Sequence, residues 1–183
     1  GTNAPEGVIL YYQMPEPADT NMLKLEIINA GGKTVRTYTN KKDPDFKSFP
    51  GGPPPAVMLP GDKGLNRFLW NFRGEQVPEI SGVYVYGDYR GYSLQPGNYK
   101  ARLMYKGKVS ETDITVLSDP NMKTDTQAWT EQQQFLEKVN SDITEIHSSV
   151  NSLRKAKKQV ATCNENLKDM PQHKALLDEG KEL

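Results

Sequence analysis

The sequence lacks most of what would cross-link the chain, anchor it in a bilayer or draw it to a polyanion. It has one cysteine, Cys163, in 183 residues, so no disulfide can form within the chain. No apolar run approaches the ~20 residues of a membrane-spanning helix, and no signal-peptide pattern is present. Lys+Arg and Asp+Glu both number 23, which leaves no net field toward nucleic acid or anionic lipid.

Motifs that carry chemistry are also missing. The sequence contains no HExxH, no CxxC pair, no GxSxG, no P-loop and no GxGxxG. Its two histidines, His147 and His173, both lie in the helical part and are expected to be surface or interface residues, because a metal site needs three or more converging ligands. Cys163 lies beside apolar helical positions, which is typical of a packing residue rather than a nucleophile. We therefore predict no catalytic residue, no metal and no cofactor.

Apolar residues are scarce as well, at 36% of the chain with a mean hydropathy of -0.71. Such a composition suits a small core with much surface, or an elongated shape. The pattern divides the chain into a β-rich part, residues 1–120, and a helical part, residues 121–183. The predicted fold is α+β by content: an all-β immunoglobulin-like antiparallel sandwich, then a long helix and a truncated second helix.

The β-rich part consists of short runs of β-forming residues separated by turn residues. Gly31 and Gly32 form a tight turn between two such runs, which predicts a hairpin over residues 23–39. Lys106 and Gly107 predict a second hairpin in the same way. About seven strands are expected in all, over residues 8–12, 23–30, 34–39, 65–73, 83–86, 99–105 and 109–116.

Alternation along these strands predicts the core. Phe68, Trp70 and Phe72 fall on one face of their strand, and Tyr99 and Leu103 share a face of another. We expect all five in the interior of the sandwich. A proline-rich and glycine-rich stretch at residues 43–64 lies between strands, where prolines remove donors, so it should be an ordered loop that packs along the sandwich.

The helical part begins with Thr126 as the expected N-cap, and residues 127–168 contain neither glycine nor proline. At ~1.5 Å per residue this helix should be a rod of roughly 60 Å. Its apolar residues recur at alternating three- and four-residue steps, a heptad-like seam that needs a partner helix. The seam consists of Leu136, Val139, Ile143, Ile146, Val150, Leu153, Val160 and Leu167.

A second helix is predicted at residues 171–183, after the break at Met170 and Pro171. It is too short to cover the seam of the first helix, so we expect the native helical hairpin or coiled coil to continue beyond it. The uncovered part of the seam should pair with another copy of the chain. Light scattering tests this expectation.

One aromatic cluster could bind a ligand. Tyr86, Tyr89, Arg90 and Tyr92 lie in and around a glycine-flanked loop, and tyrosine rings can stack on sugar faces while arginine binds hydroxyls. Tyr89 and Tyr92 would lead such a carbohydrate platform. The alternative is that these tyrosines only pack along the sheet, where tyrosine is a favoured residue.

Three segments together resemble a known arrangement. Residues 23–38 are similar to the hairpin of flagellar-hook-capping-type immunoglobulin-like domains, and residues 63–73 and 94–103 resemble the two motifs that follow it. Such a domain, with a helical hairpin after it, occurs at the C-terminal end of bacterial exported proteins built on a sortilin-like, neuraminidase-repeat (BNR) β-propeller. These proteins are commonly labelled glycosyl hydrolases.

The resemblance covers nearly the whole chain, but departs from the family in two places. Asn71 stands where the family has an aspartate after the tryptophan, and no Asp-box of the propeller repeats occurs. Hydrolase activity therefore cannot be carried onto any residue here. The resemblance implies an extracytoplasmic protein, periplasmic, secreted or on the cell surface, in which an upstream β-propeller is the partner of this module.

Three functional hypotheses follow. The first is a non-catalytic accessory or architectural module that acts through interdomain or protein–protein contacts. The second is a carbohydrate-binding module that uses the aromatic cluster of residues 84–92. The third is a glycoside hydrolase, which requires two carboxylates facing one sugar across a cleft.

Overall fold

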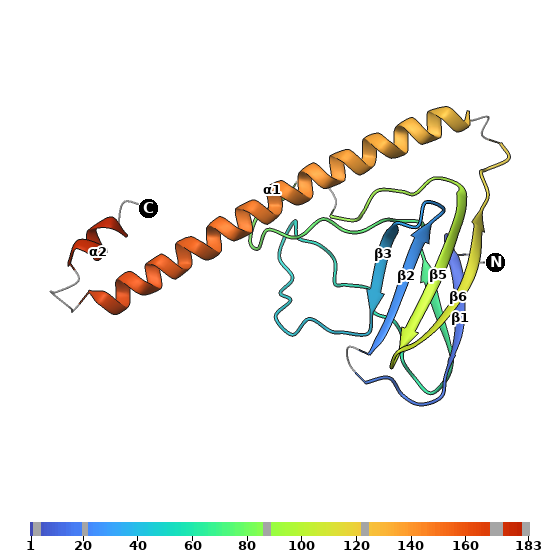
Figure 1. The fold of residues 1–183 in the computed structure, drawn as a ribbon, viewed down its shortest axis with the longest axis horizontal. Coiled ribbons are helices and arrows are strands. Elements are labelled where there is room, and N and C mark those ends of the chain that lie inside the picture. Colours follow the sequence, from blue (N-terminus) through green and yellow to red (C-terminus); the bar gives the residue numbers. More distant parts are fainter. Residues whose placement is uncertain (2–4, 20–21, 86–88, 122–124, 169–173, 181–183) are drawn as a thin grey trace.

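The computed structural model describes residues 1, 5–19, 22–85, 89–121, 125–168 and 174–180. Six strands come first: β1 (Val8–Met14), β2 (Leu23–Asn29), β3 (Thr34–Thr39), β4 (Gly64–Trp70), β5 (Gly97–Tyr105) and β6 (Lys108–Val116). Two helices follow, α1 (Thr126–Leu167) and α2 (Lys174–Glu179). The chain is thus α+β, with antiparallel strands in two sheets followed by a long helix and a short one (Figure 1).

The larger sheet has the order β3-β2-β5-β6 and contains both predicted hairpins, which are confirmed. In the β2–β3 turn, the Asn29 side chain accepts from the backbone N–H of Lys33 at 2.9 Å, and Gly32 takes a φ of 79°. In the β5–β6 turn, Lys106 and Gly107 both have positive φ, 47° and 77°. Two such residues match the twist of the strands that they join.

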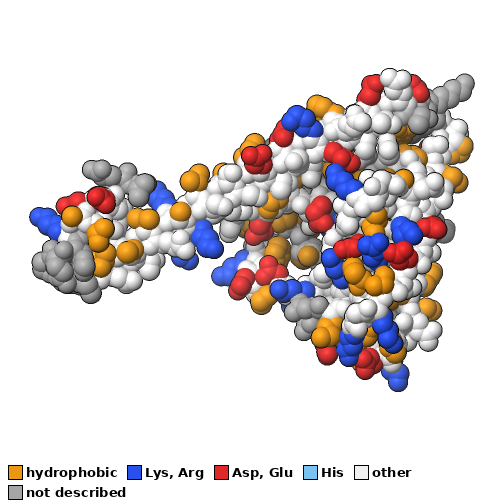
Figure 2. All heavy atoms as spheres, viewed as in Figure 1, with side chains coloured by type: hydrophobic (Ala, Val, Ile, Leu, Met, Phe, Trp, Pro, Cys, Tyr) orange, Lys and Arg blue, Asp and Glu red, His pale blue; other side chains and the backbone are white. Residues whose placement is uncertain are grey.

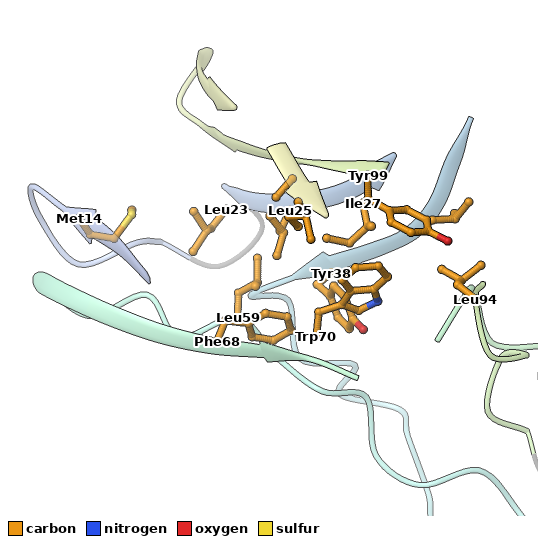
Figure 3. Packing of buried hydrophobic residues seen from close by; sticks show 13 residues of the cluster. Met14, Leu23, Leu25, Ile27, Tyr38, Leu59, Phe68, Trp70, Leu94 and Tyr99 are labelled. Atoms are coloured by element: carbon orange, nitrogen blue, oxygen red, sulfur yellow. The ribbon is translucent and has the colours of Figure 1, made fainter. Parts of the chain in front are cut away.

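The smaller sheet pairs β1 with β4, and its inner face packs on the larger sheet (Figure 3). Phe68 and Trp70 point inward from β4, while Leu23 and Ile27 meet them from β2; Trp70, Leu23 and Ile27 are fully buried. The aromatic rings meet edge to face, with Trp70 5.2 Å from Tyr99 between ring centroids. This geometry is the favoured one for ring pairs and adds to the hydrophobic contribution of the core.

Two residues expected in the core lie at its margin. Phe72 and Leu103 are half-buried and pack against the cluster rather than inside it. For Phe72 the reason is that β4 ends at Trp70, three residues earlier than predicted, and Phe72 takes a left-handed φ of 56°. The Trp70 indole Nε1 donates to the Arg73 carbonyl at 3.1 Å, which turns the chain back over the ring.

Other sequence expectations need smaller corrections. Residues 83–85 form no strand, and Tyr86, the end of that predicted strand, lies outside the described residues.

The long loop is ordered along the sandwich as expected: the Leu59 amide donates to the Thr39 carbonyl at 3.0 Å, and the Tyr12 hydroxyl donates to the Pro60 carbonyl at 2.5 Å.

Helix α1 has 42 residues, which corresponds to a rod of ~60 Å. Its N-cap is Asp125 rather than Thr126, because the Asp125 carboxylate accepts from the Gln127 amide at 3.1 Å. The helix passes one end of the sheets, over the β2–β3 turn and residues 78–81, and extends beyond them, and α2 lies beside its far end (Figure 1). Among the described residues, no helix is long and apolar enough to cross a bilayer.

Candidate functional site

The predicted tyrosine platform is not assembled on the surface. Tyr89 is 3% exposed, and its ring centroid lies 6.0 Å from that of His147 on α1. Tyr92 is half-buried between the sandwich and α1, and this burial, aided by the nearby Glu137 carboxylate, raises the pKa of its hydroxyl to about 12. Rings that are covered in this way cannot stack on a sugar, so the expectation that Tyr89 and Tyr92 lead a platform is wrong.

The remaining members of the cluster are dispersed. Tyr86 lies outside the described residues, while Arg90 is exposed and lines a different pocket. Tyr84 is 66% exposed, but its ring lies flat against Gly51, where a Cβ would approach the ring to 2.4 Å. The structure therefore brings no two of the described tyrosines of this cluster onto one open face.

Helix α1 hydrogen-bonds to the sandwich through a stripe of polar side chains, which lies beside a partly buried apolar seam. His147 Nδ1 lies 2.7 Å from the Pro78 carbonyl oxygen, which can only accept, so Nδ1 carries the hydrogen. Asn151 donates to the carbonyl of Glu79, also at 2.7 Å. Further contacts made from the same stripe are Gln133 to Gln95, Glu137 to Lys33, and Arg154 to Ser81.

Four of these five docking residues, all except Gln133, immediately follow seam residues, so the stripe lies about 100° around the helix from the seam. The seam is consequently only partly covered. Leu136, Val139, Ile143 and Val150 are half-buried, whereas Ile146 is 60% and Leu153 70% exposed. Hydrophobic side chains are visible along α1 as far as its end (Figure 2). Cys163, expected to pack beside the seam, is exposed.

The far end of the seam contacts α2. Val160 and Leu167 are half-buried there, and Gly180 packs so tightly on Asn164 that a Cβ would approach its side-chain oxygen to 2.4 Å. His173 lies outside the described residues. The short α2 leaves the middle of the seam uncovered, as the sequence predicted.

Two pockets each have two carboxylate residues in their lining: Asp43 and Glu79 beside the proline-rich loop, and Glu75 and Glu137 between β3 and α1. Glu75 and Glu137 are already engaged: Glu137 pairs with Lys33 at 2.9 Å, and Glu75 pairs with Arg36 at 3.2 Å and accepts from the Thr37 amide at 3.0 Å. A glycosidase needs one carboxyl group that can deliver a proton, and cationic partners oppose that role. No group of three or more potential metal ligands gathers among the described residues.

One concave feature could not be predicted from the sequence. A pocket of about 450 Å³ lies between β3, β4 and the loop at residues 54–60, and four arginines line it: Arg36, Arg67, Arg73 and Arg90. These arginines are spread from position 36 to position 90 of the sequence and follow no motif. Only the packing of the two sheets, which places β3 against β4, brings them together.

Comparison with known proteins adds no identification. No family model, no curated protein and no solved structure matches this chain.

Proposed function

We propose that this chain is a non-catalytic accessory module that works by contact with other protein surfaces. In this proposal an immunoglobulin-like sandwich presents a rigid helical arm within a larger exported protein, outside the cytoplasm. The exported setting and the upstream β-propeller as neighbour rest on the sequence resemblance. Two antiparallel sheets that face each other over an aromatic core support the immunoglobulin-like assignment.

The observation that carries the proposal is the division of α1 into two stripes. The polar stripe bonds the helix to the sandwich, and the apolar seam beside it is only partly buried. Ile146 and Leu153 remain 60% and 70% exposed. Full burial of such a side chain contributes ~1.5–3 kcal/mol, and contiguous exposed apolar surface marks protein contact sites.

A second copy is the occupant that we expect when this chain is studied alone. Two seams of heptad type can pair with each other, because each supplies both the knobs and the holes of the packing. In the larger protein, a further helix or domain would take the same place. The seam thus serves as the contact surface in both settings.

Light scattering over a range of protein concentrations tests the proposal. The wild-type mass should rise from 20.5 kDa toward twice that value. Ile146→Lys and Leu153→Lys should keep the chain monomeric, while Gln134→Lys, at an exposed position off the seam, should leave the association unchanged. A wild-type chain that stays monomeric throughout, or that hydrolyses aryl glycosides by itself, contradicts the proposal.

A further inference from the structure

The arginine-lined pocket has a fixed cation at its wall. Arg36 is 8% exposed and holds its guanidinium 4.8 Å from the centroid of the Tyr38 ring. Its Nη1 donates to the Gly74 carbonyl at 3.1 Å and to the Glu75 carboxylate at 3.2 Å. These contacts lock the side chain, so ordering it for a ligand costs little further conformational entropy.

Hydrogen-bonding capacity remains in this guanidinium. The Arg36 Nε–H is buried and has no acceptor among the described residues. A buried donor without a partner costs free energy. A ligand acceptor that reached the Nε–H would recover that free energy. The Glu75 carboxylate neutralises Arg36 only in part, because it is 56% exposed and also accepts from the Thr37 amide.

The other arginines make the pocket strongly cationic. Arg67 lies on β4 with its side chain exposed, and it forms no ion pair with any residue that the structure describes. Arg73 donates to the Gly91 carbonyl at 2.9 Å. This bond holds the guanidinium in position, and its positive charge remains because the carbonyl is neutral. Among the described residues, the lining of the pocket contains four arginines and no Asp or Glu. A concave site lined by one sign of charge focuses the field on a ligand of opposite sign.

The opposite wall is apolar. Pro54, Pro55, Val57 and Met58 come from the loop that covers the pocket, and the prolines offer no N–H to a ligand. The volume of about 450 Å³ is typical of sites for small organic molecules and far exceeds what an inorganic oxyanion fills. The ligand that fits this pocket is a small molecule that has an anionic group on one side and an apolar surface on the other.

We propose that this pocket binds a small organic carboxylate. The carboxylate lies among the Arg36, Arg67 and Arg73 guanidiniums, which match its two oxygens in fork geometry, and the body lies on the Pro54–Met58 wall. This binding activity goes beyond the architectural role proposed above and does not depend on it. The competing explanation is that the arginines are solvated charges at a sheet edge with no ligand.

The test is an NMR titration that observes the arginine Nε–Hε resonances of the full chain. The probes are benzoate and glucuronate, with benzamide and glucose as their neutral counterparts and inorganic sulfate as a bare anion. At least one of the two acids should shift the Arg36 resonance saturably, and the neutral compounds should not. Raising the ionic strength should weaken binding, because salt screens the attraction.

Variants locate the site. Arg67→Gln, at an exposed position that should tolerate the change, should weaken binding about tenfold, as expected for loss of one charge-assisted hydrogen bond. Lys63→Gln removes the same charge nearby but outside the lining, and should change affinity by less than about twofold. Should Arg67→Gln fail to fold, the wild-type Arg36 shift still decides the matter.

Several results would overturn the assignment. One is that neither acid shifts the Arg36 resonance saturably up to about 10 mM. Others are that the neutral compounds shift it equally, or that Arg67→Gln and Lys63→Gln change the affinity equally. Sulfate that binds as tightly as the better acid also overturns it, because the pocket then selects charge alone.

Discussion

The polar contacts of α1 make an unusual prediction: removal of two of these polar side chains should loosen the helix more than removal of an exposed apolar one. His147 and Asn151 each bond a backbone carbonyl of the sandwich at 2.7 Å. A typical side-chain hydrogen bond contributes ~0.5–1.5 kcal/mol, and the His147 ring also packs near Tyr89. Replacing both residues by alanine should cost ~2 kcal/mol of docking free energy.

The apolar comparison is Ile146→Ala. Ile146 is 60% exposed, so truncation forfeits only part of the ~0.8 kcal/mol for each methylene, and alanine forms helix better than isoleucine. We expect a net cost of ~0.5 kcal/mol. The polar pair should therefore raise the population of the undocked helix about 30-fold, and Ile146→Ala about twofold.

Hydrogen exchange measured by mass spectrometry on peptides from residues 133–154 is the appropriate assay. An isolated helix is marginal in water, so the amides of α1 owe their protection to docking. Protein concentrations should be low enough that light scattering shows a monomer, because pairing of the seams would protect the same amides. If Ile146→Ala accelerates exchange more than the polar pair does, the seam and not the polar stripe holds the helix.

Three further predictions concern the sandwich. Trp70→Ala should cost ~3–5 kcal/mol in urea unfolding, because it empties a fully buried site; a cost below ~1 kcal/mol would place Trp70 outside the core. Tyr12 and Tyr92 have pKa values raised to about 12, so their contribution to stability is complete below pH 10 and is lost as pH rises from 10 toward 12. Absorbance at alkaline pH should show late-ionising tyrosines, and simple titration of all nine near pH 10 would contradict the burial. Gly91→Ala should abolish or severely weaken folding, since its Cβ would lie 2.2 and 2.4 Å from backbone carbonyl oxygens, whereas Gly31→Ala, with no contact under 3.4 Å, should be tolerated in thermal melts.

The parts of the fold that the sequence predicted are those set by local rules. Both hairpins followed from turn residues between alternating runs, and Gly107 has the positive φ that glycine permits; the positive φ of Lys106 was not predicted. The end of β4 was missed because Phe72 continues the alternation. Its left-handed φ and the bond from Trp70 to Arg73 depend on tertiary contacts that no alternation pattern contains.

The docking face of α1 was missed for a different physical reason. The heptad-like pattern indicated a partner helix for the apolar seam and predicted no contact with the sandwich. The surface that α1 contacts is an irregular segment whose carbonyls at Pro78, Glu79 and Ser81 accept from helix side chains. Backbone carbonyls that approach a covering helix need donors, which apolar side chains cannot supply. The arginine pocket escaped prediction because its residues converge only in the folded chain.

The seam and the pocket are separate surfaces, and this separation is itself testable. None of the described residues of α1 lines the pocket, and Arg67 lies on β4 while Ile146 lies on the helix. Residues in separate sites without shared partners act additively. Arg67→Gln should therefore leave the concentration dependence of the mass unchanged, and Ile146→Lys should leave carboxylate binding unchanged. If either variant alters both properties, the two surfaces are coupled through the loop that joins β4 to β5, and one contact site rather than two would account for the molecule.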